Sequence, residues 1–431
     1  MFFEREEGGN LAVLVHIDFP DESKREDSDE FLELVRSAGA EPLALIRGSR
    51  SSPYPRLFVG EGKLEEIRAA VEEHQADLVL FNHSLKPSQE RNLEKELQCR
   101  VLDRTGLILD IFAQRARTYE GKLQVELAQL EFLTTRLIRG WTHLERQKGG
   151  IGLRGPGETQ LETDRRLIRA RINAIQRRLK KVRVQRETSR RARVQAEIPA
   201  VSLVGYTNAG KSTLFNRITK ADVYTANQLF ATLDPTLRRI ELEDVGTIVL
   251  ADTVGFIRHL PHKLVDAFQA TLQEAAEATM LLHLVDAASH ERDDNIAQVE
   301  EVLEEIGAAD VPSLMVFNKI DLLEQKPRIE RNAEGIPERV WLSAVTGEGC
   351  DLLLQAINER LAIKIVKGTL ELEPEQTRLR AALFNLNAVL DERYSEEGQC
   401  QLQLRLPQKD FRQLLSQLNM AEESLVWVTK P

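Results

Sequence analysis

The sequence predicts an α/β protein with an N-terminal α/β domain carrying a long antiparallel helical hairpin, a central α/β domain and a small C-terminal α/β domain. Strands and helices alternate over the first hundred residues and, more weakly, after residue 364. Two heptad seams fill residues 123–182, and four short apolar strands in residues 199–364 each end in a polar turn. Alternation is typical of parallel sheets covered by helices, whereas steps of three and four residues are typical of packed helices. We therefore expect domains at residues 1–115, 116–195, 199–364 and 366–431.

Length and composition limit the class of protein. The chain of 431 residues is long enough for about three domains, and 42% hydrophobic with 29% charged residues is typical of a soluble globular protein. Its three cysteines lie far apart and in no metal-ligand spacing, which favours a reducing compartment. The start is acidic, and no apolar run approaches the length of a membrane span. We expect a cytoplasmic monomer with no membrane span.

The N-terminal domain is predicted from βαβ rhythm. Strands are expected at residues 11–17, 42–46 and 78–81, and helices at residues 28–38, 63–73 and 87–97. The pair Gly60 and Gly62 is not a dinucleotide fingerprint, because Glu65 stands where the third glycine would be.

The hairpin is predicted from two apolar seams separated by glycines. The first seam is Leu123, Leu127, Leu130, Thr134, Leu137, Trp141 and Leu144; the second is Leu161, Ile168, Ile172, Ile175, Leu179 and Val182. Residues 149–160 between them hold five glycines and a proline, which predicts a tip. Thr159 and Glu162 have the spacing of a capping box for the second helix. Residues 165–193 carry thirteen Lys or Arg and one acid, a charge of +12, so the remainder of the chain carries −22 within a net charge of −10.

A phosphate-binding loop is predicted after the strand at residues 200–204. The segment that follows has the Gly-x-x-x-x-Gly-Lys-Ser pattern and leads into a helix. Glycines let backbone N–H groups turn toward phosphates, the lysine reaches the β- and γ-phosphates, and the serine ligates Mg²⁺. The predicted contacts are Gly205, Tyr206, Thr207, Asn208, Ala209, Gly210, Lys211, Ser212 and Thr213.

Three further strand ends predict the rest of a guanine-nucleotide site. Residues 247–251 lead to Asp252, which can hold Mg²⁺ through water, and to Gly255, whose N–H can meet the γ-phosphate. Residues 314–317 lead to Asn318, Lys319 and Asp321; this carboxylate can accept both donors of the guanine edge. Residues 340–342 lead to two residues whose backbone can meet guanine O6, Ser343 and Ala344. Four such motifs in this order predict a P-loop GTPase domain with a mixed, mostly parallel sheet, binding GTP/GDP and Mg²⁺.

The first switch is expected at residues 230–236. Phe230 is predicted to contact the nucleotide, and Thr232, preferred over Thr236, to complete a Mg²⁺ shell with Ser212 and Asp252. The predicted catalytic residues are Lys211, Thr232 and Gly255.

The residue after Gly255, in the expected second switch at residues 252–256, is unsuited to orienting water. Phe256 stands where small GTPases place a glutamine, so hydrolysis should be slow until a partner completes the site. Asn208 occupies the position from which, in the cation-dependent GTPases that this loop resembles, a side chain helps to bind K⁺. His259 and His262 nearby are interpreted as a solvated loop rather than a metal site.

These motifs together closely resemble the HflX family of ribosome-associated GTPases, in the translation-factor-related class of P-loop GTPases. The residues that carry the resemblance are 58–63, 103–112, 149–161, 205–213, 230–236 and 252–256. The resemblance implies that the chain binds the large ribosomal subunit and its rRNA and helps to split or rescue stalled ribosomes. It also implies ATP hydrolysis and RNA remodelling in some members.

Other interpretations stay open at this point. A P-loop kinase is disfavoured by the guanine-specifying Asp321, and a tRNA- or rRNA-associated GTPase of RNA modification or ribosome assembly is a second alternative. A coiled-coil scaffold that binds nucleotide only structurally is a third. The basic segment at residues 165–193 has its own alternative, a solvated coiled-coil face.

Overall fold

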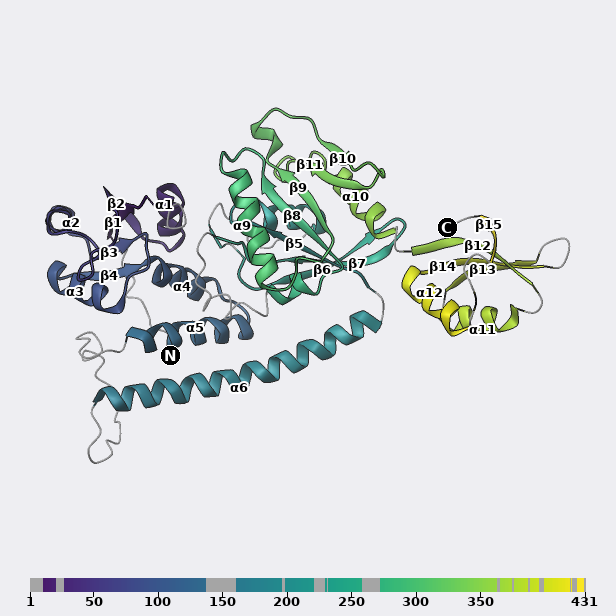
Figure 1. The fold of residues 1–431 in the computed structure, drawn as a ribbon, viewed down its shortest axis with the longest axis horizontal. Helices are drawn as coiled ribbons and strands as arrows, with labels where there is room; N and C mark the ends of the chain where they lie inside the picture. Colours follow the sequence, from purple (N-terminus) through teal and green to yellow (C-terminus); the bar gives the residue numbers. More distant parts are fainter. Residues whose placement is uncertain are drawn as a thin grey trace.

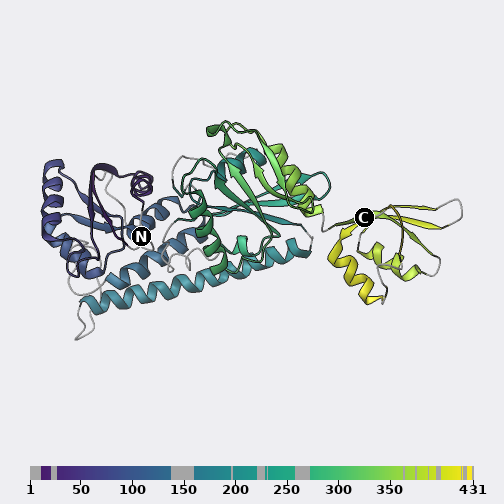
Figure 2. The same ribbon diagram turned by 45° about the horizontal axis from the view of Figure 1, so that its top comes forward.

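The computed structural model describes residues 11–20, 27–136, 160–195, 198–220, 229–230, 232–257, 272–362, 365–373, 376–386, 388–394, 399–418, 420 and 425–429. Three sheets follow one another along the long axis of the molecule, and one long helix runs beneath the first two (Figures 1 and 2). Within the described ranges, no helix is both long enough and apolar enough to cross a membrane.

The N-terminal sheet is parallel, in the order β2-β1-β3-β4. Its elements are β1 (Leu11–Asp18), α1 (Ser28–Ser37), β2 (Glu41–Ser49), α2 (Glu61–His74), β3 (Leu78–Phe81), α3 (Pro87–Leu97), β4 (Arg100–Asp103) and α4 (Arg104–Arg115). All six predicted elements are confirmed. The last two were not predicted, because β4 has only four residues and runs into α4 without a glycine or proline between them.

The helical hairpin pairs α5 (Tyr119–Arg136) with α6 (Gln160–Gln195), and the two predicted seams meet where Leu123, Leu127 and Leu130 pack with Ile175 and Leu179. Leu123 of α5 is buried against Ile175 and Leu179 of α6. Ion pairs flank this seam, from Arg171 to Glu126 and from Arg186 to Glu120. Residues 149–159 of the expected tip, Thr159 among them, and the last three residues of the first seam lie outside the described residues.

The central sheet has seven strands in the order β10-β11-β9-β8-β5-β7-β6. It is parallel except at its two edges, where β6 pairs with β7 and β10 with β11 in antiparallel fashion, so the mixed, mostly parallel sheet is confirmed. The strands are β5 (Ala200–Gly205), β6 (Thr236–Leu242), β7 (Gly246–Asp252), β8 (Met280–Asp286), β9 (Ser313–Asn318), β10 (Arg328–Arg331) and β11 (Pro337–Trp341). The helices whose bounds the structure gives in full are α7 (Lys211–Thr219), α9 (Arg292–Glu305), η3 (Ile320–Leu322) and α10 (Cys350–Ala362).

The C-terminal domain is an antiparallel sheet, β13-β14-β12-β15, with two helices on one face (Figure 1). Its elements are β12 (Ile365–Leu372), α11 (Thr377–Asn385), β13 (Val389–Tyr394), β14 (Cys400–Pro407), α12 (Gln408–Gln417) and β15 (Val426–Thr429). This order is that of a ferredoxin-like unit. The sequence pattern after residue 364 predicts one helix over residues 376–390, and this prediction is wrong in its second part: α11 stops at Asn385, and Val389 pairs with Leu404 of β14 instead.

The N-terminal and central domains share one apolar core. Phe31 of α1 and Phe112 of α4 belong to the same buried cluster as Phe230, Leu233 and Phe256 of the central domain. The segments expected to form the two switches therefore lie at a domain interface.

Candidate nucleotide-binding site

The P-loop joins β5 to α7, and its shape depends on glycine. Gly205 has φ +146°, and a Cβ there would lie 2.3 Å from the Leu284 carbonyl oxygen. Gly210, the N-cap of α7, has φ +93°, and its Cβ would lie 2.2 Å from Nδ2 of Asn318. Because this N-cap has no side chain, the N–H groups at the start of α7 are left for a ligand. Thr213 lies in the first turn of that helix.

Lys211 folds back over the loop that precedes it. Its Nζ donates to the carbonyl oxygens of Gly205, at 2.9 Å, and Tyr206, at 2.8 Å. Burial lowers the pKa of this ammonium group to about 8, and the nearby Asp252 carboxylate opposes that shift. The lysine is therefore positioned next to the space that the P-loop encloses.

The three predicted metal ligands come together. The hydroxyl of Ser212 lies 2.7 Å from both Oγ1 of Thr232 and Oδ2 of Asp252, and Thr232 donates to the same Oδ2 at 2.9 Å. Burial raises the pKa of Asp252, while the hydrogen bonds from the two hydroxyls lower it. Its other oxygen, Oδ1, is buried without a hydrogen-bond partner in the described chain. Two hydroxyls and a carboxylate with an open oxygen fit a partly hydrated Mg²⁺.

The second switch begins directly against the P-loop. A Cβ on Gly255 would lie 2.9 Å from Cγ2 of Thr207 and 3.0 Å from Nζ of Lys211. Phe256 then pairs with the loop through its backbone: its N–H donates to Gly205 at 3.2 Å, and its carbonyl accepts from Thr207 at 2.7 Å. The Phe256 ring is buried in the shared domain core. Sequence reasoning missed this backbone pairing, and His259 and His262 lie outside the described residues.

Asn318 ties the guanine-side loops together. Its Nδ2 donates to the Ala209 carbonyl at 2.8 Å, and its Oδ1 accepts from the N–H of Ala344 at 2.9 Å. Asp321 follows in η3 with an exposed side chain. The next residue after Asn318, Lys319, has φ +67° and pairs with Asp286 at 2.6 Å.

The loop after β11 is held from both sides. Oγ of Ser343 accepts from the N–H of Thr346 at 3.2 Å. Arg217 of α7 donates from Nε to the Ala344 carbonyl at 3.3 Å and also bonds the Val345 carbonyl. Arg217 was not predicted, because an arginine on a helix carries no sequence signal for a contact more than a hundred residues away.

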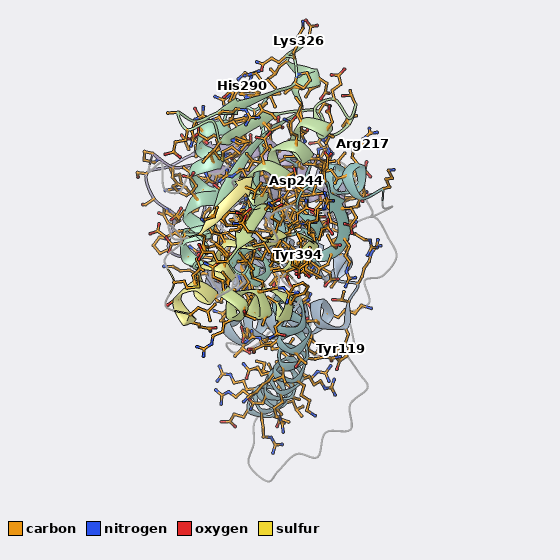
Figure 3. All side chains as sticks on the ribbon, turned by 90° about the vertical axis from the view of Figure 1, so that its right-hand side faces the viewer. Tyr119, Arg217, Asp244, His290, Lys326 and Tyr394 are labelled. Atoms are coloured by element: carbon orange, nitrogen blue, oxygen red, sulfur yellow. The ribbon has the colours of Figure 1, made fainter. Side chains whose placement is uncertain are left out.

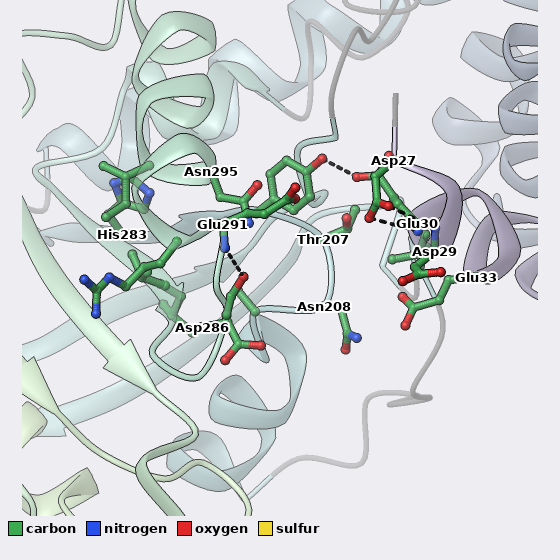
Figure 4. A pocket seen from close by; sticks show the side chains of 18 residues that line it. Asp27, Asp29, Glu30, Glu33, Thr207, Asn208, His283, Asp286, Glu291 and Asn295 are labelled. Atoms are coloured by element: carbon green, nitrogen blue, oxygen red, sulfur yellow. Dashed lines mark hydrogen bonds between the residues drawn. The ribbon is translucent and has the colours of Figure 1, made fainter. Parts of the chain in front are cut away.

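The N-terminal domain covers one side of the P-loop. Acidic residues of the α1 region, Asp27, Asp29, Glu30 and Glu33, line a cavity of about 200 Å³ together with Tyr206, Thr207 and Asn208 (Figure 4). The hydroxyl of Tyr206 donates to Glu30, which also pairs with Arg104. The ring of Phe230 packs edge-on against Phe112, with centroids 4.6 Å apart, so its side chain is engaged with the N-terminal domain.

Comparisons with known proteins cover almost the whole chain. Four family models match: GTP-binding GTPase N-terminal at residues 25–113, GTP-binding GTPase Middle Region at 115–193, 50S ribosome-binding GTPase at 200–319 and HflX C-terminal domain at 328–425. GTPase HflX of Escherichia coli is 62% identical over 96% of this chain and 98% of its own length. GTPase HflX of Magnetococcus marinus is 46% identical over 86% and 85%.

Among solved structures, the chain is similar to a GTP-binding protein from Sulfolobus solfataricus in complex with GDP. The two are 25% identical with a TM-score of 0.45, over 82% of this chain and 99% of that one. Given the E. coli and Magnetococcus relatives, this chain belongs to the HflX family and is a GTP-hydrolysing P-loop GTPase.

Proposed function

We propose that this GTPase binds the large ribosomal subunit and its rRNA and uses GTP binding and hydrolysis to split or rescue stalled ribosomes in the cytoplasm. The observation that carries the proposal is the exposed basic surface of α6, which lies on a chain whose central domain matches a family described as 50S ribosome-binding GTPase. RNA is a polyanion, and neutralising its phosphates supplies affinity.

The basic surface lies opposite the seam that holds the hairpin together. Ile175 and Leu179 face α5, while Arg177, Arg178, Lys180 and Lys181 between and after them are exposed. We define these four as the basic patch. Figure 3 shows side chains ending in nitrogen that project from the hairpin into solvent. A solvated coiled-coil face would need no such clustering, so the patch favours a nucleic acid partner.

For the chemistry of the site, we propose that Ser212 and Thr232 ligate Mg²⁺ directly and Asp252 through water. Lys211 would contact the β- and γ-phosphates, and the N–H of Gly255 the γ-phosphate, because it lies beside Lys211. Mg²⁺ would supply charge neutralisation at the phosphates.

The described site contains no group that takes the place of a water-orienting glutamine, since Phe256 turns its ring into the core. Turnover should therefore be slow in the isolated protein and faster with ribosomal subunits, the partner completing the site.

Asn208, with φ +60° in the P-loop, is our candidate for a K⁺ ligand. A cation there would supply positive charge near the phosphates, as an arginine finger does elsewhere. Turnover in K⁺ should then exceed turnover in Na⁺, and equal rates in the two salts would remove this part of the proposal.

Co-sedimentation with purified large and small subunits, in GDP and in a non-hydrolysable GTP analogue, tests the proposal. Changing the basic patch to glutamine should weaken binding to the large subunit and reduce the salt slope by about 0.7 to 0.9 per lost phosphate contact. The matched control changes four exposed lysines outside α6 to glutamine: Lys95, Lys122, Lys220 and Lys326. Equal loss in both variants, or no binding by the parent, contradicts the proposal.

Shortening the tip of the hairpin tests whether ribosome binding and ribosome splitting depend on different parts of the hairpin. Residues 149–159 of the glycine-rich tip lie outside the described residues, and the proposed role of the tip rests on sequence. Shortening residues 150–157 should spare binding and impair splitting, because the tip would enter an RNA-walled cavity by shape rather than charge. If the shortened protein splits ribosomes as well as the parent at matched salt, the tip has no such role.

A further inference from the structure

Asp234 of the first switch lies at the N-terminus of the first hairpin helix, α5. Its Oδ2 accepts from the backbone N–H groups of Arg117 and Thr118, both at 2.8 Å. Its Oδ1 accepts from the Thr118 hydroxyl at 2.5 Å. A residue of the central domain therefore satisfies backbone donors of a helix more than a hundred residues earlier in the chain.

The arrangement is a capping box completed by another domain. Thr118 is the N-cap of α5, because its hydroxyl accepts from the N–H of Gly121 at 2.9 Å. In an ordinary capping box the side chain three residues on returns to the N-cap N–H. Here that residue is Gly121, which has no side chain, and Asp234 takes its place. A Cβ on Gly121 would lie 2.0 Å from Oδ1 of Asp234, so the glycine leaves room for the carboxylate.

The start of the same switch segment, and the residue before it, also contact the N-terminal domain. The N–H of Leu229 donates to the Ser37 hydroxyl at 2.9 Å, and Phe230 packs on Phe112. Thr232, between these anchors and two residues before Asp234, is the residue that reaches Ser212 and Asp252.

We propose that Asp234 is a positioning residue that couples the first switch to the hairpin: it caps α5 when Thr232 is held at the nucleotide site, and leaves α5 when the switch is released. The inference rests on the proposed function for the role of Thr232 toward Mg²⁺. Coupling of this kind is reciprocal, so a capped α5 favours the GTP-bound switch as much as GTP favours the cap.

Two variants on different elements test the coupling in the full-length protein without ribosomes. Asp234→Ala should weaken binding of a non-hydrolysable GTP analogue by about fivefold, the loss that one N-cap contact produces, and leave GDP binding unchanged. Gly121→Ala should do the same by displacing the carboxylate, although alanine is the better helix former. The double variant should be no worse than either single one.

Two control variants distinguish the loss of the cap from the loss of a negative charge. Asp234→Asn keeps acceptor and donor atoms for the cap and should retain most of the preference for the GTP analogue, and Glu243→Ala removes an exposed acid of the same domain and should change nothing. Hydrogen exchange gives a direct readout: the amides of Arg117 and Thr118 should be protected with the GTP analogue and exposed with GDP.

Three results would overturn the coupling: equal losses of GTP-analogue and GDP affinity in Asp234→Ala, an unchanged preference in Gly121→Ala, or equal protection of the two amides in both nucleotides. Thr232→Ala tests the proposed metal role separately. A loss of GTP-analogue affinity in Thr232→Ala with none in Asp234→Ala overturns the coupling alone.

Discussion

Helices α4 and α7 both start at the carboxyl end of a parallel strand, yet their N-termini are capped by different types of residue. The N-cap of α4 is Asp103, whose carboxylate accepts from the N–H of Gly106 at 2.8 Å. The N-cap of α7 is Gly210, which offers no side-chain acceptor. A helix N-terminus attracts anions, and in α4 the chain supplies its own. The N-terminus of α4 is therefore occupied by the chain itself, whereas the N-terminus of α7 is open to a phosphate.

The residues around the N-termini of α4 and α7 differ in the same way. Asp103 also accepts from Arg136 at 2.7 Å, and the same arginine pairs with Glu90 at 2.7 Å, so both buried carboxyl groups have a partner within the domain. Around α7, Oγ1 of Thr207 and Oδ1 of Asp252 are buried without partners in the described chain. The first set stabilises the fold, and the second is left for a ligand.

The largest expected effect is a loss of stability when Arg136, the partner of both buried carboxyl groups, is replaced. Arg136→Met leaves two buried carboxylates unpaired and should lower the free energy of unfolding of the N-terminal domain by about 3 to 5 kcal/mol. Urea titrations followed by hydrogen exchange of α3 and α4 measure it, with Lys122→Met, an exposed change on the same helix, as control. Affinity for GTP should change less than the stability does. A large loss of affinity with intact stability would show that Arg136 acts on nucleotide binding rather than on the fold.

Replacing Lys211 of the P-loop should reduce GTP binding rather than stability. Lys211→Ala should weaken GTP binding by about 3 kcal/mol, or a hundredfold, because it removes a charged contact to the phosphates. The free energy of unfolding should not fall, since the ammonium group is costly to bury. Titration with fluorescent GTP measures the affinity, and Lys326→Ala is an exposed control in the same domain. Tight GTP binding by Lys211→Ala would show that the P-loop was assigned a wrong role.

Guanine selectivity is expected to depend on Asp321, at the base-binding end of the site. Asp321→Asn should weaken GTP binding by about 1.5 to 3 kcal/mol and favour xanthosine nucleotides, because an amide cannot accept both guanine donors. Competition between GTP and XTP measures the switch in preference. Asp351→Asn, at the start of α10, serves as a matched control. Unchanged GTP affinity in Asp321→Asn would mean that another residue reads the base.

The smallest effect is a pH dependence in the N-terminal domain. Burial raises the pKa of Glu90 from its ordinary 4.5 to about 7, with Arg136 opposing the shift. The folded domain therefore holds this proton more tightly than the unfolded chain, so the stabilisation is complete below about pH 4.5 and is lost as the pH rises through 7. Between pH 5 and 7.5 the loss should be about 2 kcal/mol.

Glu90→Gln should remove most of that slope in the free energy of unfolding, whereas the exposed Glu72→Gln should keep it. An unchanged slope in Glu90→Gln would assign the titration to another group, such as Asp103, whose pKa burial also raises.

Sequence predicted those parts of the fold and site that depend on local pattern. The P-loop, the strand ends that lead to Asp252 and Asn318, and the seam through Ile175 and Leu179 each follow from residue types at fixed spacing. Glycines and apolar periodicity carry this information over fewer than twenty residues.

The contacts between domains could not be predicted in this way. Tyr206 with Glu30, Asp234 with Thr118, and Phe230 with Phe112 join segments more than a hundred residues apart. Each pair combines common residue types and leaves no periodicity in the sequence. Gly121 is a glycine in the first turn of a helix, which is unusual in sequence. The reason for it can be given only when the structure places Asp234 beside it.

The length of α6 has a mechanical consequence. Its 36 residues span about 54 Å, ending at Gln195, and β5 begins at Ala200 and runs directly into the P-loop. A hydrogen-bonded helix resists stretching, so a displacement along its axis at the far end of the hairpin reaches the other end with little loss. The helix therefore extends from the far end of the hairpin to within five residues of the strand that leads into the phosphate-binding loop (Figure 2).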